Sequence, residues 1–175
     1  MKKIALGLLA GVSLYSATAL ASDGTINIAG NVTANTCTPA GTAGKNISVT
    51  LPTVGTTTLA TAGATAGATP FSISLTGCPA GVAKAQTNFE AGPTINTATG
   101  NLLNSTASGS ATNVEVQLLS DTMKAINLNN NANSQVVAVS GGKATMSYYA
   151  QYIAAGGAAT AGTVATSVQY TIAYP

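Results

Sequence analysis

The sequence contains no histidine, no arginine and no tryptophan, and only 6% of its 175 residues are charged. Without histidine, a hydrolytic triad has no base that exchanges a proton near neutral pH, and the few carboxylates and lysines are spread along the chain. Without arginine or a basic cluster, the chain lacks the side chains that neutralise nucleic-acid phosphates. We therefore predict a protein that is not an enzyme, uses no cofactor and does not bind nucleic acid.

Cysteine is also scarce, since Cys37 and Cys78 are the only two. A metal or redox pair needs close spacing or histidine partners, so these two cysteines are predicted to form a disulfide in an exported chain. Closing a loop of roughly forty residues stabilises the fold by about 4 kcal/mol in the chain-entropy model. The asparagine-rich stretch 127–133 lacks the carboxylates that calcium prefers, so it is predicted to be a turn and no metal site is expected.

The first 21 residues have the three parts of a secretory signal. Lys2 and Lys3 are positively charged, residues 4–14 are mostly apolar, and Ala19-Leu20-Ala21 matches a small-x-small cleavage pattern. The apolar stretch is too short for a membrane span of about twenty residues, so we expect cleavage after Ala21 and export. The remaining 154 residues are enough for one domain, and their four lysines balance four acidic residues.

The rest of the chain alternates between short strand-like segments and turn-rich segments. Alternation of apolar and polar residues with a period of two is typical of half-buried strands, and no stretch has a helical period. The predicted strands are 47–51, 71–76, 87–90, 114–119, 135–139, 144–154 and 164–174. The Ala-Thr-Gly runs 57–69 and 154–166 are predicted to be surface loops, the second with room for a short helix. This pattern predicts an antiparallel, all-β sandwich of immunoglobulin type.

Two of the predicted strands carry side chains for which the pattern gives a specific expectation. Glu115 occupies a polar position of an alternating strand, so we expect it to face solvent. On the strand 144–154, Tyr148 and Tyr152 share one face and Tyr149 points the other way. A sugar could stack on an exposed Tyr149, but a single exposed aromatic more often belongs to a packing interface or is an ordinary strand residue.

Two alternating segments lie at the ends of the exported chain. The first, 24–32, lies outside the loop closed by the cysteines, and the second, 168–175, ends on a strand whose edge is uncovered. One face of the first segment comprises Gly24, Ile26, Ile28, Gly30 and Val32, and one face of the second comprises Val168, Tyr170, Ile172 and Tyr174. This arrangement indicates a subunit that lends its first strand to a neighbour and accepts one in return.

These end segments, the strand 113–119, the segment 150–154, the cysteine placement and the signal together resemble major pilins of the chaperone-usher class, similar to type 1 fimbrial shaft subunits. The resemblance covers essentially the whole precursor and departs from the family at Pro175, where a polar residue is usual. It implies an incomplete immunoglobulin-like β-sandwich that lacks its seventh strand. The implied parts are a signal peptide at 1–21, an N-terminal donor-strand extension at 22–33 and a pilin domain at 34–175.

The resemblance also implies a mode of assembly. In such pilins a periplasmic chaperone fills a hydrophobic groove beside the terminal strand, and at the outer-membrane usher the N-terminal extension of the next subunit replaces it. On this sequence the donor face is Gly24, Ile26, Ile28, Gly30 and Val32, and the acceptor groove includes Val168, Tyr170, Ile172 and Tyr174. Gly30 then either permits close backbone approach where the groove is shallow or marks a bulge. The implied product is a homopolymeric fimbria on the cell surface that supports adhesion.

Two other classes of protein stay open at this point. A minor adaptor pilin has the same parts as a shaft subunit, and a free-standing secreted binding domain would fold its first strand onto its own sheet. A tip adhesin usually carries an additional lectin domain, and the length of this chain argues against that class.

Overall fold

The computed structural model describes residues 26–30, 36–40 and 45–175. The chain divides into two compact units, Met1–Val32 and Thr33–Pro175. The predicted signal peptide lies outside the described residues, and in the described part of the chain no helix is long and apolar enough to cross a membrane. All of the described strands belong to the second unit.

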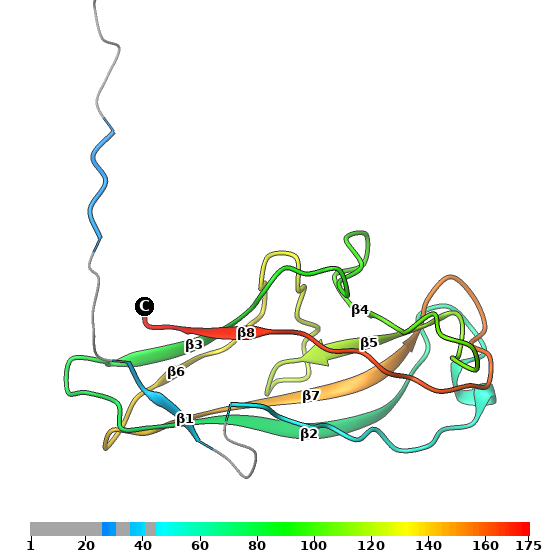
Figure 1. Cartoon of the computed structure of the whole chain (residues 1–175), viewed down its shortest axis with the longest axis horizontal. Helices are drawn as coiled ribbons and strands as arrows, with labels where there is room; N and C mark the ends of the chain where they lie inside the picture. The colour runs from blue at the N-terminus through cyan, green and yellow to red at the C-terminus, as the bar shows by residue number, and fades with distance from the viewer. Residues whose placement is uncertain (1–25, 31–35, 41–44) are drawn as a thin grey trace, which may run out of the picture. The chain divides into compact units, whose positions relative to one another are not determined.

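Two antiparallel sheets form the second unit (Figure 1). The five-stranded sheet has the order β1-β2-β7-β5-β4 and consists of β1 (Thr38–Ala40), β2 (Thr65–Thr76), β7 (Ala144–Ala154), β5 (Val114–Leu119) and β4 (Leu102–Leu103). The three-stranded sheet has the order β6-β3-β8 and consists of β6 (Val136–Ala138), β3 (Lys84–Phe89) and β8 (Tyr170–Ala173). A single turn of 3-10 helix, η1, spans Thr56–Leu59. The predicted all-β, immunoglobulin-like sandwich is confirmed.

The core forms around β7, the central strand of the larger sheet. β7 pairs with β2 on one side and β5 on the other, and its alternate residues from Ala144 to Ala150 are buried. The ring of Tyr148 is fully buried and lies 5.5 Å from that of Phe71 in β2 and 5.6 Å from that of Phe89 in β3. Because these three rings come from both sheets, their contacts hold the two layers of the sandwich together.

Most of the predicted strands are confirmed, and β5 and β7 have the predicted bounds. The predicted loop 57–69 was wrong, since it begins in η1 and its end, from Thr65 onward, extends β2 along β7. A bulge between Ala66 and Thr69 accommodates Gly67, whose φ is +72° and whose missing Cβ would contact Tyr152 at 3.2 Å. Pairing with β7 therefore overrides the weak local preference of an Ala-Thr-Gly run. The segment 154–166 contains no helix beyond the end of β7 and is irregular, as predicted.

The expectation for Glu115 was also wrong. Its side chain is only 4% exposed, and its carboxylate accepts hydrogen bonds from Asn96 Nδ2 at 2.6 Å, Thr99 Oγ1 at 2.8 Å and Asn101 Nδ2 at 3.0 Å. The loop between β3 and β4 covers this outer face of β5. The alternation of apolar and polar residues along β5 itself cannot predict that cover. Three neutral donors satisfy the buried carboxylate.

The asparagine-rich stretch forms turns, as predicted. Within it, Asn131 Oδ1 accepts a bond from the backbone nitrogen of Phe89 at 2.8 Å, and its Nδ2 donates to the Phe89 carbonyl at 3.1 Å. The residues that the structure describes include no group of three His, Cys, Asp or Glu side chains that could hold a metal ion. Asn131 therefore acts as a backbone partner at the end of β3.

Candidate functional site

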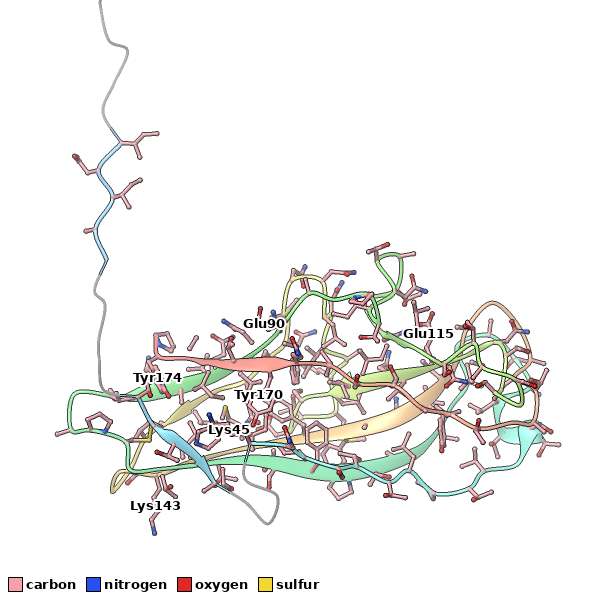
Figure 2. The ribbon with its side chains drawn as sticks, in the orientation of Figure 1. Lys45, Glu90, Glu115, Lys143, Tyr170 and Tyr174 are labelled. Carbon is pink, nitrogen blue, oxygen red and sulfur yellow. A yellow bond between two sulfur atoms is a disulfide. The ribbon has the colours of Figure 1, made fainter. Side chains whose placement is uncertain are left out.

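A groove of about 1180 Å³ lies between β8 and the segment 45–51. Its floor is the open side of the core, formed by buried residues such as Ile73, Leu102 and Val116. One wall is the terminal strand with Tyr170 and Tyr174, and the other wall begins at Lys45, as labelled in Figure 2. Because the floor is apolar and the groove is open, it can bury a chain segment with apolar side chains.

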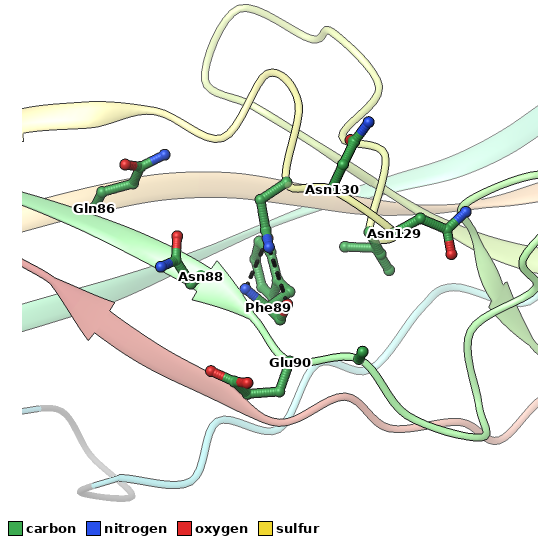
Figure 3. Close-up of a pocket in the computed structure, with 9 residues that line it drawn as sticks. Gln86, Asn88, Phe89, Glu90, Asn129 and Asn130 are labelled. Carbon is green, nitrogen blue, oxygen red and sulfur yellow. Dashed lines mark hydrogen bonds between the residues drawn. The ribbon is translucent and has the colours of Figure 1, made fainter. Parts of the chain in front are cut away.

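A second, smaller hollow of about 420 Å³ lies beside the end of β3 (Figure 3). Side-chain amides surround it, with Gln86 and Asn88 on β3 and Asn129 and Asn130 on the neighbouring turn. Among the described residues that line it, Glu90 is the one that carries a charge. The hollow is therefore lined mainly by neutral amides and lacks the apolar floor of the larger groove.

The terminal strand forms the first wall of the large groove. The structure places Val168, Tyr170, Ile172 and Tyr174 on the groove side, where they are half-buried and pack against the core. Gln169 and Thr171 are exposed, while Ala173 is half-buried. The four apolar residues predicted for the acceptor face therefore lie along one groove wall.

The backbone of this strand is paired on one edge only. The register pairs Thr87 with Ile172, and Glu90 N donates to the Gln169 carbonyl at 2.9 Å. Because hydrogen-bonded pairs alternate along an antiparallel ladder, Gln169 and Thr171 direct their backbone groups toward β3, while Tyr170 and Ile172 direct theirs toward the groove. In the part of the chain that the structure describes, no strand pairs with this second edge. This second edge of the terminal strand can therefore form backbone hydrogen bonds with an added strand.

The second wall of the groove is the segment 47–51, which we predicted to be a strand. In the segment 47–51, Ile47, Val49 and Leu51 alternate with polar residues and line the groove, but the segment belongs to none of the assigned strands. Similarly, of the predicted strand 164–174 only Tyr170–Ala173 is assigned as a strand. A strand is defined by its ladder, and among the described residues no neighbour lies between these two walls to supply one. The sandwich therefore lacks a strand at this position.

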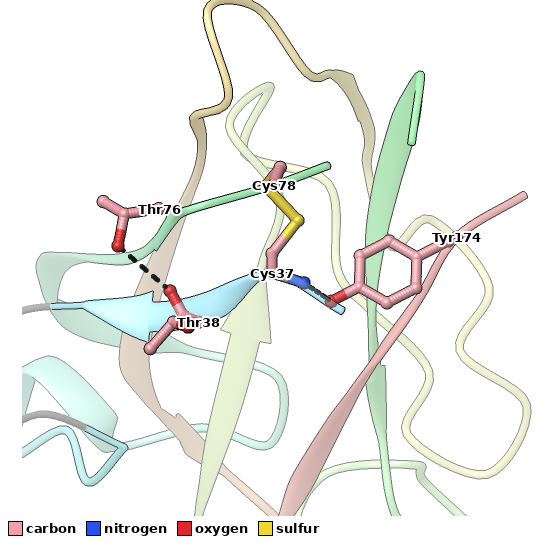
Figure 4. The surroundings of a disulfide bond; sticks show 5 residues. All are labelled: Cys37, Thr38, Thr76, Cys78 and Tyr174. Atoms are coloured by element: carbon pink, nitrogen blue, oxygen red, sulfur yellow. Dashed lines mark hydrogen bonds between the residues drawn. A yellow bond between two sulfur atoms is a disulfide. The ribbon is translucent and has the colours of Figure 1, made fainter. Parts of the chain in front are cut away.

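Two tyrosines of the terminal segment connect the walls. Tyr170 Oη donates to the Lys45 carbonyl at 2.9 Å, and Cys37 N donates to Tyr174 Oη at 3.0 Å (Figure 4). Burial raises the pKa of the Tyr170 phenol. The bonds fix how the terminal segment lies against the chain that follows Cys37.

The predicted disulfide is present and anchors the start of that chain. Cys37 precedes β1 directly and Cys78 follows β2 by two residues, with an S–S distance of 2.03 Å (Figure 4). β1 pairs with the end of β2 in the register Thr38 with Thr76. Because Cys37 also donates to Tyr174, the disulfide holds one end of the groove in place.

The predicted donor face lies in the first unit. Ile26 and Ile28 are 89% and 92% exposed, and residues 26–30 have no assigned secondary structure. Gly24 and Val32 lie outside the described residues. Burying an exposed isoleucine is worth about 1.5–3 kcal/mol, so this segment gains stability wherever it finds an apolar partner. Its role as a donor strand stays a prediction.

Comparison with known families and relatives gives consistent matches. Residues 51–175 match the sequence model of the family "Type-1 fimbrial protein, A". The chain is 47% identical to the major fimbrial subunit SMF-1 of Stenotrophomonas maltophilia, over 88% of this chain and 94% of that protein. It is 46% identical to the F17 fimbrial protein of Escherichia coli, over 97% of this chain and 96% of the relative.

Solved structures support the fold. The P pilus rod subunit PapA superposes with a TM-score of 0.61 over 79% of this chain and 99% of that one. The two sequences are only 16% identical, so this likeness concerns the fold alone.

Proposed function

The chain belongs to the type-1 fimbrial protein family and is a structural subunit of a fimbria, and on that premise we propose that it polymerises by donor-strand exchange. In this reaction residues 22–33 of one copy occupy the groove of the next copy and supply the strand that its sandwich lacks. The open backbone edge of β8 above an apolar floor is the observation that carries the proposal.

The dimensions of donor and groove agree. The nine residues 24–32 span about 30 Å as an extended strand, and the groove wall runs over the eleven residues 164–174. A strand of alternating pattern inserted there directs one face toward the core and leaves the other in solvent. Five inward-facing positions therefore fit along the wall without overhang.

The energetics favour a stable linkage. Burying Ile26, Ile28 and Val32 contributes about 1.5–3 kcal/mol each, and each new ladder hydrogen bond contributes about 1 kcal/mol. Donor residues that face the core pair with β8, and the residues between them direct their backbone groups toward the opposite wall. The inserted strand therefore bonds to both walls, which explains how a fibre persists without covalent links between subunits.

The proposal includes the route to the fibre. An unoccupied groove exposes apolar core, so we expect a periplasmic chaperone to cover it after export and an outer-membrane usher to exchange the chaperone for the next subunit. As a fimbrial subunit the chain functions outside the cell, and the fibre is a polymer of like copies.

A pair of adjacent substitutions tests the proposal. Ile28→Asp places a carboxylate on the donor face, where burial in the groove costs several kcal/mol, whereas Asn27→Asp adds the same charge to the outward face. Both variants are expressed with their chaperone and usher, and surface fibres are counted by electron microscopy. We expect fibres from Asn27→Asp and only chaperone-bound subunit from Ile28→Asp. Normal fibres from Ile28→Asp would show that this segment is not the donor.

A further inference from the structure

The smaller hollow beside the end of β3 has no role in the proposed exchange of strands (Figure 3). Its volume of about 420 Å³ lies within the range of small-molecule sites. β3 alternates between buried and partly exposed residues, and the outward side chains of Gln86 and Asn88 line the hollow together with Glu90, which follows the strand directly. Gln86 and Asn88 do not line the large groove, so the two features use different side chains of β3.

The turn on the other side of the hollow is held in place by its own hydrogen bonds. Asn130 Oδ1 accepts a bond from Ala132 N at 3.0 Å. The two bonds between the Asn131 amide and the backbone of Phe89 fix the same turn against β3. Because this wall is already ordered, a ligand loses little binding energy to ordering it.

Several polar groups that line the hollow are available to a ligand. In Figure 3 no hydrogen bond joins the amide of Gln86 or Asn88 to another lining residue. The carboxylate of Glu90 accepts a bond from Thr171 Oγ1 through Oε1, which leaves Oε2 as a further acceptor. The lining therefore offers two amides that can each donate and accept, and a carboxylate that can accept.

A peptide strand cannot pair with β3 at this point, because the backbone of β3 is already bonded on both edges. β8 pairs with one edge from Gln86 to Phe89. On the other edge, Ser134 Oγ donates to the Thr87 carbonyl at 2.6 Å, and Asn131 bonds the backbone of Phe89. An occupant of the hollow therefore meets side chains and not an open backbone edge.

The chemistry of these side chains favours an uncharged ligand that is rich in hydroxyl groups. A single carboxylate among amides does not supply the several charged oxygen ligands that calcium prefers, and it repels an anion. An apolar ligand would cover the amides without forming hydrogen bonds, which costs free energy. Hydroxyl groups donate to carboxylate and amide oxygens and accept from amide NH₂ groups, so a neutral saccharide satisfies all of them.

We propose that this hollow binds a neutral saccharide through hydrogen bonds to Gln86, Asn88 and Glu90. Each such bond contributes a modest net free energy, so one hollow binds one sugar weakly. Because the chain is a fimbrial subunit, every copy in a fibre carries the same hollow, and a surface with many sugars engages many copies at once. The shaft of the fibre thereby contributes to adhesion along its length.

Saturation-transfer NMR on purified fibres tests the proposal, with the methyl glycosides of glucose, galactose, mannose and N-acetylglucosamine as probes. We expect saturation to reach at least one of these sugars, and its titration gives the affinity. Loss of one net hydrogen bond corresponds to about fivefold weaker binding, so we expect Gln86→Leu and Asn88→Leu each to weaken it by about that factor. Ser147→Ala, an exposed substitution on β7, is the control and should bind as the unsubstituted fibre does.

The double variant Gln86→Leu/Asn88→Leu identifies the site. We expect it to form normal fibres, because neither residue lines the groove, and to bind the sugar more weakly than either single variant. Absence of transfer to all four neutral sugars, unchanged transfer in the double variant, or stronger transfer to methyl glucuronide than to methyl glucoside would each overturn the inference. Fibre assembly in those cases leaves donor-strand exchange standing. If the double variant forms no fibres, the two single variants decide the same question.

Discussion

Replacing Glu115 by glutamine tests whether the buried carboxylate holds the loop between β3 and β4 in place. The substitution keeps the size of the side chain but exchanges one acceptor oxygen for an NH₂ donor. Three donors, on Asn96, Thr99 and Asn101, converge on the carboxylate, so the new NH₂ group faces at least one of them. A hydrogen bond to a charged group contributes about 1.5–3 kcal/mol, and the abandoned donor stays buried. We expect Glu115→Gln to lower the free energy of unfolding by about 2–4 kcal/mol.

Denaturant unfolding of the exported chain, followed by circular dichroism under oxidising conditions, measures this change. Glu90→Gln is the matched control, because Glu90 is exposed and the same chemical change there should move the midpoint little. The slope with denaturant should be the same for both variants, since neither changes the surface exposed on unfolding. A Glu115→Gln midpoint equal to that of Glu90→Gln would refute the assignment of Glu115 as a stabilising buried group.

Two further substitutions test other parts of the structure. Replacing Cys37 and Cys78 together by serine opens a loop whose ends are 41 residues apart, so we expect a loss of about 4 kcal/mol, measured as a lower unfolding midpoint that no longer responds to reductant. Tyr170→Phe removes the bond to the Lys45 carbonyl while keeping the ring in the groove wall, so we expect a loss of about 1 kcal/mol in the chain alone. An unchanged unfolding midpoint for Tyr170→Phe would mean that the hydroxyl does not connect the two walls.

Several features of this protein follow from its sequence alone. The alternation at 114–119 and 144–154 predicted the bounds of β5 and β7, because a strand buried between two neighbours keeps one face apolar whatever its partners are. The disulfide was predictable because only two cysteines are present. The apolar face of the terminal strand followed from the same period of two, and its four residues line one wall of the groove.

Tertiary structure decided the rest, and in each case the reason is a contact that no local pattern contains. Thr65–Pro70 have a loop-like composition and become strand through pairing with β7. Glu115 is buried because a distant loop brings three donors to it. The segment 47–51 has the pattern of a strand but no assigned ladder, since ladder formation depends on a neighbour and the described chain supplies none at that edge. Side-chain alternation is local to a strand, whereas burial and backbone pairing depend on what lies beside it.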